Sequence, residues 1–132
     1  MPTIEDFSKF EFKVAKIVDV QDHPNADRLY VLKIDVGDVD IEPQNILAAQ
    51  QGNDIPNENI LPVPKYKQIV AGIKRSYTKE QLIGKQIIVI NNLEPAILRG
   101  VESNGMLLAA SDDDGVAIIM PDREMKIGSR VK

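Results

Sequence analysis

The stretch KQIVAGIKRSYTKEQLIGKQIIVI, residues 67–90, is the most informative part of the sequence because it places a helix pattern between two strand patterns. Residues 67–73 and 86–90 are rich in β-branched and apolar side chains, which is typical of strands. Between them, Thr78 is followed three residues later by Gln81, the spacing of a capping box at a helix N-terminus. We therefore expect one or two turns of helix between two strands.

Two further strands are expected before this stretch. Residues 10–20 alternate between apolar and polar side chains, with Lys16 interrupting the pattern, and residues 28–36 carry apolar side chains at every second position from Tyr30 to Val36. Because neighbouring side chains of a strand point to opposite faces, each pattern predicts one buried face. The predicted buried side chains are Phe10, Phe12, Val14, Val18 and Val20 in the first strand and Tyr30, Leu32, Ile34 and Val36 in the second.

The C-terminal part of the sequence predicts two more strands. Residues 106–110 and 116–120 are apolar runs, whereas residues 91–95 and 99–105 are rich in turn-forming residues and predict loops. Three strands, a short helix and two more strands is the order of an OB-fold. We therefore expect an all-β protein, an OB-fold five-stranded Greek-key barrel with its helix between strands three and four. Other small barrels and sandwiches share much of this pattern.

Length and composition predict one domain with an irregular insertion. The 132 residues fit a single domain over residues 1–132. Residues 39–66 contain four prolines and four asparagines, and predict an irregular insertion between the second and third strands. No stretch approaches the ~20 consecutive apolar residues of a membrane span, and the N-terminus lacks the pattern of a signal peptide. We therefore expect a cytoplasmic protein with no membrane partner.

The sequence offers little for catalysis or for metal binding. It has no cysteine and a single histidine, His23, which excludes thiolate chemistry and a multi-histidine metal centre. The phosphate-binding patterns GxxxxGK[ST] and GxGxxG are both absent. The acidic run at residues 112–114 lacks the spacing of a calcium-binding loop and predicts a solvated turn. We expect no enzymatic activity, no cofactor and no metal site.

The net charge of −4 hides an uneven distribution along the chain. Residues 1–64 carry twelve acidic and five basic side chains, whereas residues 65–100 carry seven basic and two acidic ones. Since binding depends on local charge, the basic middle of the chain predicts a positive face suited to nucleic acid. Lysines that are merely solvated at the surface are the alternative explanation.

Seven motifs, in the same order, resemble the tRNA-binding domain family. This domain occurs at the C-terminus of many bacterial methionyl-tRNA synthetases, as the β subunit of archaeal methionyl-tRNA synthetase, and in endothelial monocyte-activating polypeptide II. The motifs cover nearly the whole chain except residues 39–66. They are FEFKVAKI (10–17), HPNADRLY (23–30), LKIDVG (32–37), QIVAGI (68–73), YTKEQLIGK (77–85), NNLEP (91–95) and LRGVESNGMLLAA (98–110).

The resemblance implies an OB-fold with a C-terminal extension, frequent homodimers, and binding of tRNA by its shape. From it we expect a non-catalytic, structure-specific tRNA-binding protein, acting as an accessory (β) subunit or trans-acting factor that raises the tRNA affinity of methionyl-tRNA synthetase. The alternative is a protein-binding chaperone or dimerisation module on the same barrel. For a homodimer, we expect the apolar runs 106–110 and 116–120 to be buried between subunits.

Nine residues are candidates for RNA contact. Charge and resemblance together favour phosphate contacts by Lys74, Arg75 and Lys85 over solvated surface charge. Lys33 is expected on the outer face of its strand, where solvated surface charge is the stronger explanation. Arg99 has the geometry for a bidentate contact. The resemblance makes Ser103 and Met106 RNA contacts as well, the alternative being that Met106 lies in the barrel core. The candidates are Lys33, Lys74, Arg75, Lys85, Asn92, Arg99, Ser103, Asn104 and Met106.

Overall fold

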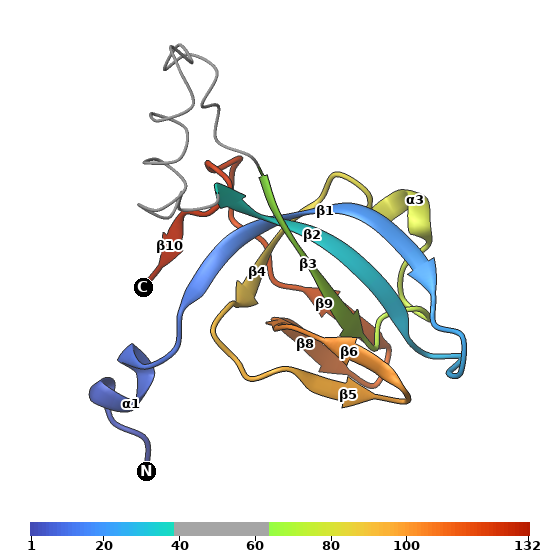
Figure 1. Cartoon of the computed structure of the whole chain (residues 1–132), viewed down its shortest axis with the longest axis horizontal. Coiled ribbons are helices and arrows are strands. Elements are labelled where there is room, and N and C mark those ends of the chain that lie inside the picture. The colour runs from blue at the N-terminus through green and yellow to red at the C-terminus, as the bar shows by residue number, and fades with distance from the viewer. Residues whose placement is uncertain (39–63) are drawn as a thin grey trace, which may run out of the picture.

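The computed structural model describes residues 1–38 and 64–132, which form a curled antiparallel sheet (Figure 1). The main strand order is β3-β2-β1-β4-β7, and β10 pairs with the start of β1. This order confirms the predicted OB-type barrel. The strands of this sheet are β1 (Phe12–Asp22), β2 (Tyr30–Asp38), β3 (Pro64–Ala71), β4 (Gln86–Ile90), β7 (Met106–Leu107) and β10 (Arg130–Val131).

Residues 103–105 close the sheet against β3. The Asn104 backbone N–H donates to the Gln68 carbonyl at 2.8 Å. The Ser103 hydroxyl accepts from the Val70 N–H at 3.0 Å and donates to the Gly105 carbonyl at 3.0 Å. The Ser103 hydroxyl therefore accepts the hydrogen bond that a backbone carbonyl of a neighbouring strand would otherwise accept. We call this contact between residues 103–105 and β3 the seam.

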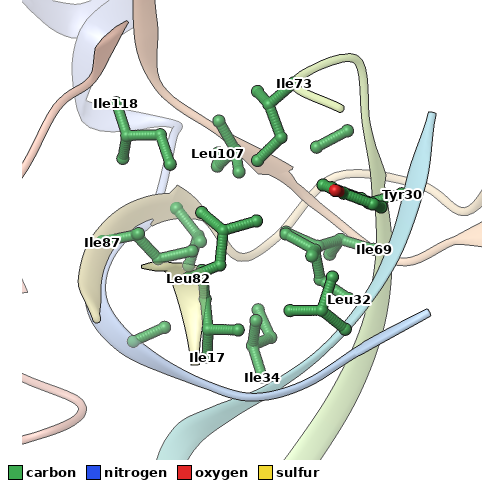
Figure 2. Packing of buried hydrophobic residues seen from close by; sticks show 14 of the residues in the cluster. Ile17, Tyr30, Leu32, Ile34, Ile69, Ile73, Leu82, Ile87, Leu107 and Ile118 are labelled. Carbon is green, nitrogen blue, oxygen red and sulfur yellow. The ribbon is translucent and has the colours of Figure 1, made fainter. Parts of the chain in front are cut away.

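The predicted helix is present as α3 (Lys79–Leu82), between β3 and β4. Thr78 and Gln81 form both hydrogen bonds of the predicted capping box. Leu82 is fully buried at one end of the barrel, in contact with the core cluster that Figure 2 shows. The short helix thus covers this end of the core with the apolar side chain of Leu82.

The core is built largely from alternate residues of the strands, as the pattern of residues 28–36 predicts (Figure 2). All four predicted inward residues of β2 are buried, and the Tyr30 hydroxyl donates to the Tyr77 carbonyl at 2.9 Å. The core cluster comprises Ala15, Ile17, Val20, Tyr30, Leu32, Ile34, Val36, Ile69, Ala71, Ile73, Leu82, Ile87, Val89, Leu107 and Ile118.

The prediction for the buried face of β1 is wrong over much of its length. The core residues before the middle of the strand are Ala15 and Ile17, and Val20 follows them. The pairing register with β2 shifts between Ile17 and Asp19, which is the signature of a β-bulge that reverses which side chains face inward. Val14 is also buried, outside this cluster, and its backbone bonds to Gly128 and Ser129 of the C-terminal segment.

Several elements differ from the predicted loops and strands. Residues 64–66 of the predicted insertion belong to β3, and the remainder of that prediction, residues 39–63, lies outside the described residues. The predicted fifth strand is divided into β7 and a separate strand. The additional elements are α1 (Ile4–Ser8), β5 (Ala96–Leu98), β6 (Val101–Ser103), β8 (Ala109–Asp112) and β9 (Gly115–Ile118).

Two antiparallel hairpins, β5–β6 and β8–β9, complete the fold (Figure 1). The β8–β9 hairpin is attached by side chains of the segment between β3 and α3. The Val116 N–H donates to the Ser76 hydroxyl, and the Ile118 N–H donates to the Tyr77 hydroxyl, both at 3.0 Å. Among residues 1–38 and 64–132, no helix combines the length and apolar character needed to cross a membrane.

Replacing Ser103 by Ala tests the seam. The change leaves the buried Val70 N–H without its acceptor, and we expect a loss of about 1–3 kcal/mol in the free energy of unfolding. Chemical denaturation measures this loss. Ser111→Ala, at an exposed serine of β8, is the matched control and should leave the unfolding midpoint unchanged. Equal midpoints for the two variants would contradict a structural role for the Ser103 hydroxyl.

Candidate nucleic-acid interface

Three arginines converge at the end of the barrel where β1 turns into β2. Arg28 comes from the β1–β2 connection, Arg75 from the segment between β3 and α3, and Arg99 from the tip of the β5–β6 hairpin. Together they line a hollow of about 570 Å³. The other lining residues are Asn25, Ala26, Asp27 and Leu29.

The positive charge of this hollow is available for a ligand. Arg28, Arg75 and Arg99 are all exposed. Within the described part of the chain, none of the three forms an ion pair with an N···O distance of 4.0 Å or less. Guanidinium groups form paired hydrogen bonds with phosphate oxygens, so the hollow has the chemistry of a phosphate site.

Two side chains from the β1–β2 connection, the buried His23 and the exposed Asn25, hold the β5–β6 hairpin. His23 is 5% exposed, and its Nε2 lies 2.9 Å from the Leu98 carbonyl. Its Nδ1 accepts from the Asn25 N–H at 2.9 Å, which assigns the ring proton to Nε2 as the donor to Leu98. The Asn25 side-chain amide donates to the Arg99 carbonyl at 3.1 Å. His23 therefore has a structural position beneath the hairpin.

Lys74 lies near this hollow but is already paired. Its ammonium is 3.2 Å from one carboxylate oxygen of Asp22, and the Lys79 ammonium is 3.1 Å from the other. The hydrogen bonds from Lys79 and Lys74 lower the pKa of the Asp22 carboxyl below its ordinary value. The charge of Lys74 is thus shared with a carboxylate, unlike that of Arg75.

Lys85 lines a different concavity. It lies 3.7 Å from the Met120 sulfur and 5.9 Å from the centre of the Tyr77 ring. A groove of about 810 Å³ runs here between α3 and residues 120–127. Its basic lining residues are Lys16, Lys85, Arg123 and Lys126, and its acidic ones are Asp122 and Glu124.

The SNGM motif divides into buried and exposed parts. The Ser103 side chain is 4% exposed and makes both of its hydrogen bonds within the protein. Asn104 contributes its backbone to the seam. Met106 is 53% exposed and borders a hollow of about 320 Å³ beside Val70 and Gly72. The alternative in which Met106 lies in the barrel core is therefore wrong.

Asn92 ties the N-terminal segment to the barrel. Its side-chain oxygen accepts from the Glu11 N–H, and its amide donates to the Lys9 carbonyl, both at 2.7 Å. Both ends of the Asn92 amide are therefore occupied within the protein.

Lys33 lies on the outer face of β2, where its ammonium is 4.6 Å from the centre of the Tyr66 ring. On this outer face, Lys33 and Tyr66 line a hollow of about 310 Å³ together with Asp19 and Gln21. Lys67 pairs with the buried Ile34, so its side chain lies on the other face of the sheet. There its ammonium donates to the Asn91 carbonyl at 2.7 Å, and burial lowers the pKa of Lys67 below its ordinary value.

The structure brings together only some of the predicted candidates. Arg75 and Arg99 share one hollow, and Lys33 and Lys85 line two others. Arg28 was not among the predicted candidates, although it lies within the motif HPNADRLY. The signal was concealed because Arg28 belongs to the acidic N-terminal half, where charge counts along the chain hide it.

Comparisons with known proteins agree with this fold. Residues 12–59 and 63–130 match the family described as "Putative tRNA binding domain". The chain is 45% identical over 128 residues to a methionine–tRNA ligase of Thermococcus onnurineus, which covers 97% of this chain. It is 43% identical over 127 residues to the methionine–tRNA ligase of Nanoarchaeum equitans, covering 96% of this chain. The chain spans 14% and 13% of the length of these two ligases.

Solved structures with a similar fold include two proteins that match over the whole of this chain. A MetRS-related protein from Pyrococcus horikoshii is similar with a TM-score of 0.73 and 28% identity, over 100% of this chain and 98% of that one. A CsaA chaperone protein from Picrophilus torridus is similar with a TM-score of 0.74 and 28% identity, over 100% of both chains. On the strength of the family match across nearly all of its length, the chain belongs to the tRNA-binding domain family.

Proposed function

We propose that this chain binds folded tRNA through the phosphates of its backbone. The observation that carries the proposal is the convergence of Arg75 and Arg99 on one hollow without ion-pair partners among the described residues, in a member of the tRNA-binding domain family. When arginines bind phosphates, they displace cations that are condensed around the nucleic acid. The release of these cations supplies much of the affinity of protein–nucleic acid complexes.

The chemistry of the hollow favours recognition of shape over recognition of sequence. Its described lining residues include no aromatic side chain on which a base would stack. Proteins that bind bare single strands rely on such stacking, whereas contacts with phosphate and ribose depend on how the RNA is folded. A folded tRNA therefore fits this surface better than an unstructured strand.

The chain acts, in this proposal, as a non-catalytic tRNA-binding unit for methionyl-tRNA synthetase in the cytoplasm, as an accessory subunit or a trans-acting factor. Its identity of 45% with part of a methionine–tRNA ligase supports this partner. An additional weak tRNA site raises the local concentration of tRNA near the enzyme, which increases the overall affinity without a new contact in the catalytic domain.

A protein-binding role is the second candidate. It is favoured by the similarity to the CsaA chaperone protein of Picrophilus torridus and by the groove between α3 and residues 120–127, whose lining includes Ile83, Met120 and Met125. An electrophoretic mobility shift with tRNA at physiological salt separates the two roles. The absence of any shift would favour the chaperone role.

The first prediction for tRNA binding concerns its dependence on salt. With about three to five phosphates neutralised, the slope of log K against log salt concentration should be on the order of −2 to −4. Arg75→Ala should flatten this slope by roughly one unit. Lys74→Ala should change it less, because Asp22 already compensates part of the Lys74 charge. Fluorescence anisotropy over a salt series measures both, and equal slopes for all three proteins would contradict this interface.

Met106 provides a test of apolar contact. Since its side chain is 53% exposed, Met106→Ala should leave the melting temperature nearly unchanged. If Met106 packs against a base or ribose, the variant should bind tRNA more weakly with the same salt slope, because an apolar contact releases no counterions. Melting curves and anisotropy decide the matter, and unchanged affinity would remove Met106 from the interface.

We also propose that the chain forms a homodimer. Of the two apolar runs predicted to be buried between subunits, Leu107 and Ile118 are part of the core, while Ile119 and Met120 remain 43% and 45% exposed. These exposed side chains support an interface on the second run. Burial of such residues in a partner subunit would remove apolar area from water.

Sedimentation equilibrium tests the dimer. At micromolar concentration the mass should be twice the 14.7 kDa of one chain. Ile119→Glu should shift the protein toward monomer, since it places a charge in an apolar contact. Ile97→Glu, at a residue of β5 that is 66% exposed, is the matched control and should sediment as the wild type does. A wild-type mass of one chain would refute the dimer.

A further inference from the structure

We propose that Arg28, Arg75 and Arg99 form one preorganised site for the ribose-phosphate backbone of RNA, here called the arginine cradle, and that Asn25 is a positioning residue for Arg99. The proposal rests on the tRNA binding proposed above. It adds a binding residue, Arg28, and assigns a role to the hydrogen bonds beneath the hairpin.

The backbone segments that carry Arg28 and Arg75 are joined directly. The Lys74 N–H donates to the Arg28 carbonyl at 3.4 Å, so the residue before Arg75 is bonded to Arg28 itself. The Tyr30 hydroxyl makes a second link between β2 and the segment before α3, through the Tyr77 carbonyl. The two arginines therefore belong to one rigid frame rather than to two independent loops.

The conformation of Arg99 is set by the tip of the β5–β6 hairpin. Leu98 pairs with Val101, so Arg99 and Gly100 form a two-residue turn, with φ values of +55° and +88°. Type I′ hairpin turns require a positive φ at both central residues, and among the described residues Arg99 is the one non-glycine with a positive φ. Here the Asn25 amide holds the Arg99 carbonyl and His23 holds the Leu98 carbonyl. The turn and these two hydrogen bonds together fix the backbone of a residue that lines the hollow.

The three arginines of the cradle carry positive charge that no carboxylate pairs with among the described residues. Like charges that lie together repel one another, and proteins commonly offset them with carboxylates. Asp27 is the single acidic residue in the described lining, and it forms no ion pair within 4.0 Å with any of the three arginines. By contrast, Lys74 and Lys79 share Asp22. A cluster of uncompensated arginines in a chain of net charge −4 indicates that an anionic ligand completes it.

The volume of the hollow limits which ligands it can hold. Its volume of about 570 Å³ lies within the range of sites that hold a small organic ligand and far exceeds the space of one inorganic phosphate. The lining presents three guanidinium groups, which are donors suited to phosphate and ribose oxygens. We therefore assign the cradle to the RNA backbone.

The experiment measures the affinity of the intact chain for a fluorescently labelled folded tRNA, over a salt series, for single variants. Arg28→Ala and Arg75→Ala should each weaken binding by at least about fivefold and flatten the salt slope by about one unit. Arg130→Ala is the charge-matched control, because Arg130 lies on β10 at the other end of β1. It should bind within about twofold of the wild type, by the same charge argument.

Arg99→Gly separates binding from folding. Glycine adopts a positive φ without steric cost, so this variant should be at least as stable to heat as the wild type while its affinity for tRNA falls at least about fivefold. Reduced affinity together with reduced stability would mean that Arg99 acts on the fold and not as a direct contact with the RNA.

The role of Asn25 is tested by a double-mutant cycle. If Asn25 acts by holding the hairpin, Asn25→Ala should weaken binding in the wild type and have no further effect in the Arg99→Gly background. An additive loss would mean that Asn25 acts independently of Arg99 and would overturn its assignment as a positioning residue. Circular dichroism melting of all four proteins verifies that the affinities refer to folded chains.

The outcomes separate the cradle from the proposed function. Wild-type protein that fails to bind tRNA overturns the tRNA-binding function. The cradle is overturned if the wild type binds tRNA and the Arg28→Ala and Arg75→Ala variants have the same affinity as Arg130→Ala. In that case the tRNA-binding function still holds. A nucleoside monophosphate added at equal ionic strength should leave the complex intact. Release of the tRNA by this small ligand would mean that the site is not built for the RNA backbone.

Discussion

The bulge between Ile17 and Asp19 in β1 is the constraint on which the rest of the barrel depends. Before it, β1 pairs with β4, and after it β1 pairs with β2 alone. A bulge bends the strand and increases its twist, which lets one long strand serve both sides of a curled sheet. It also sets which β1 side chains fill the core and leaves Val14 to be covered by the C-terminal segment. The end of β1 then brings His23 beneath the β5–β6 hairpin.

The sequence allowed the regular parts of the fold to be predicted, because their patterns are local. The alternation in residues 28–36 and the capping box at Thr78 and Gln81 both appear in the structure as expected. The face of β1 was not predictable in this way, since one extra residue in a ladder leaves no mark in composition but reverses the alternation. The β5–β6 hairpin was missed because its strands are three residues each, and all of β5 is exposed.

The sequence predicted the chemistry of the candidate site, a group of basic side chains, but not which residues form it. Charge counts along the chain pointed to the basic middle, and this included Arg75 and Arg99. The same charge counts included Lys74, although its charge is paired with Asp22, which lies far away in sequence and close in space. They omitted Arg28, which three-dimensional proximity adds to the same hollow. Ser103 and Asn92 were chosen for their polar groups, and the folded chain uses those groups in its own hydrogen bonds.

The β2–β3 ladder has one further consequence, for how this domain tolerates change. Tyr30 pairs with Ala71 at the end beside the arginines, and Asp38 pairs with Pro64 at the opposite end. The residues at which the connection between β2 and β3 begins and ends, Asp38 and Pro64, are therefore fixed opposite each other. Closing a longer connection between fixed points costs little additional entropy. Evolution can lengthen or shorten this connection while the register of both strands, and the geometry at the far end, stay the same.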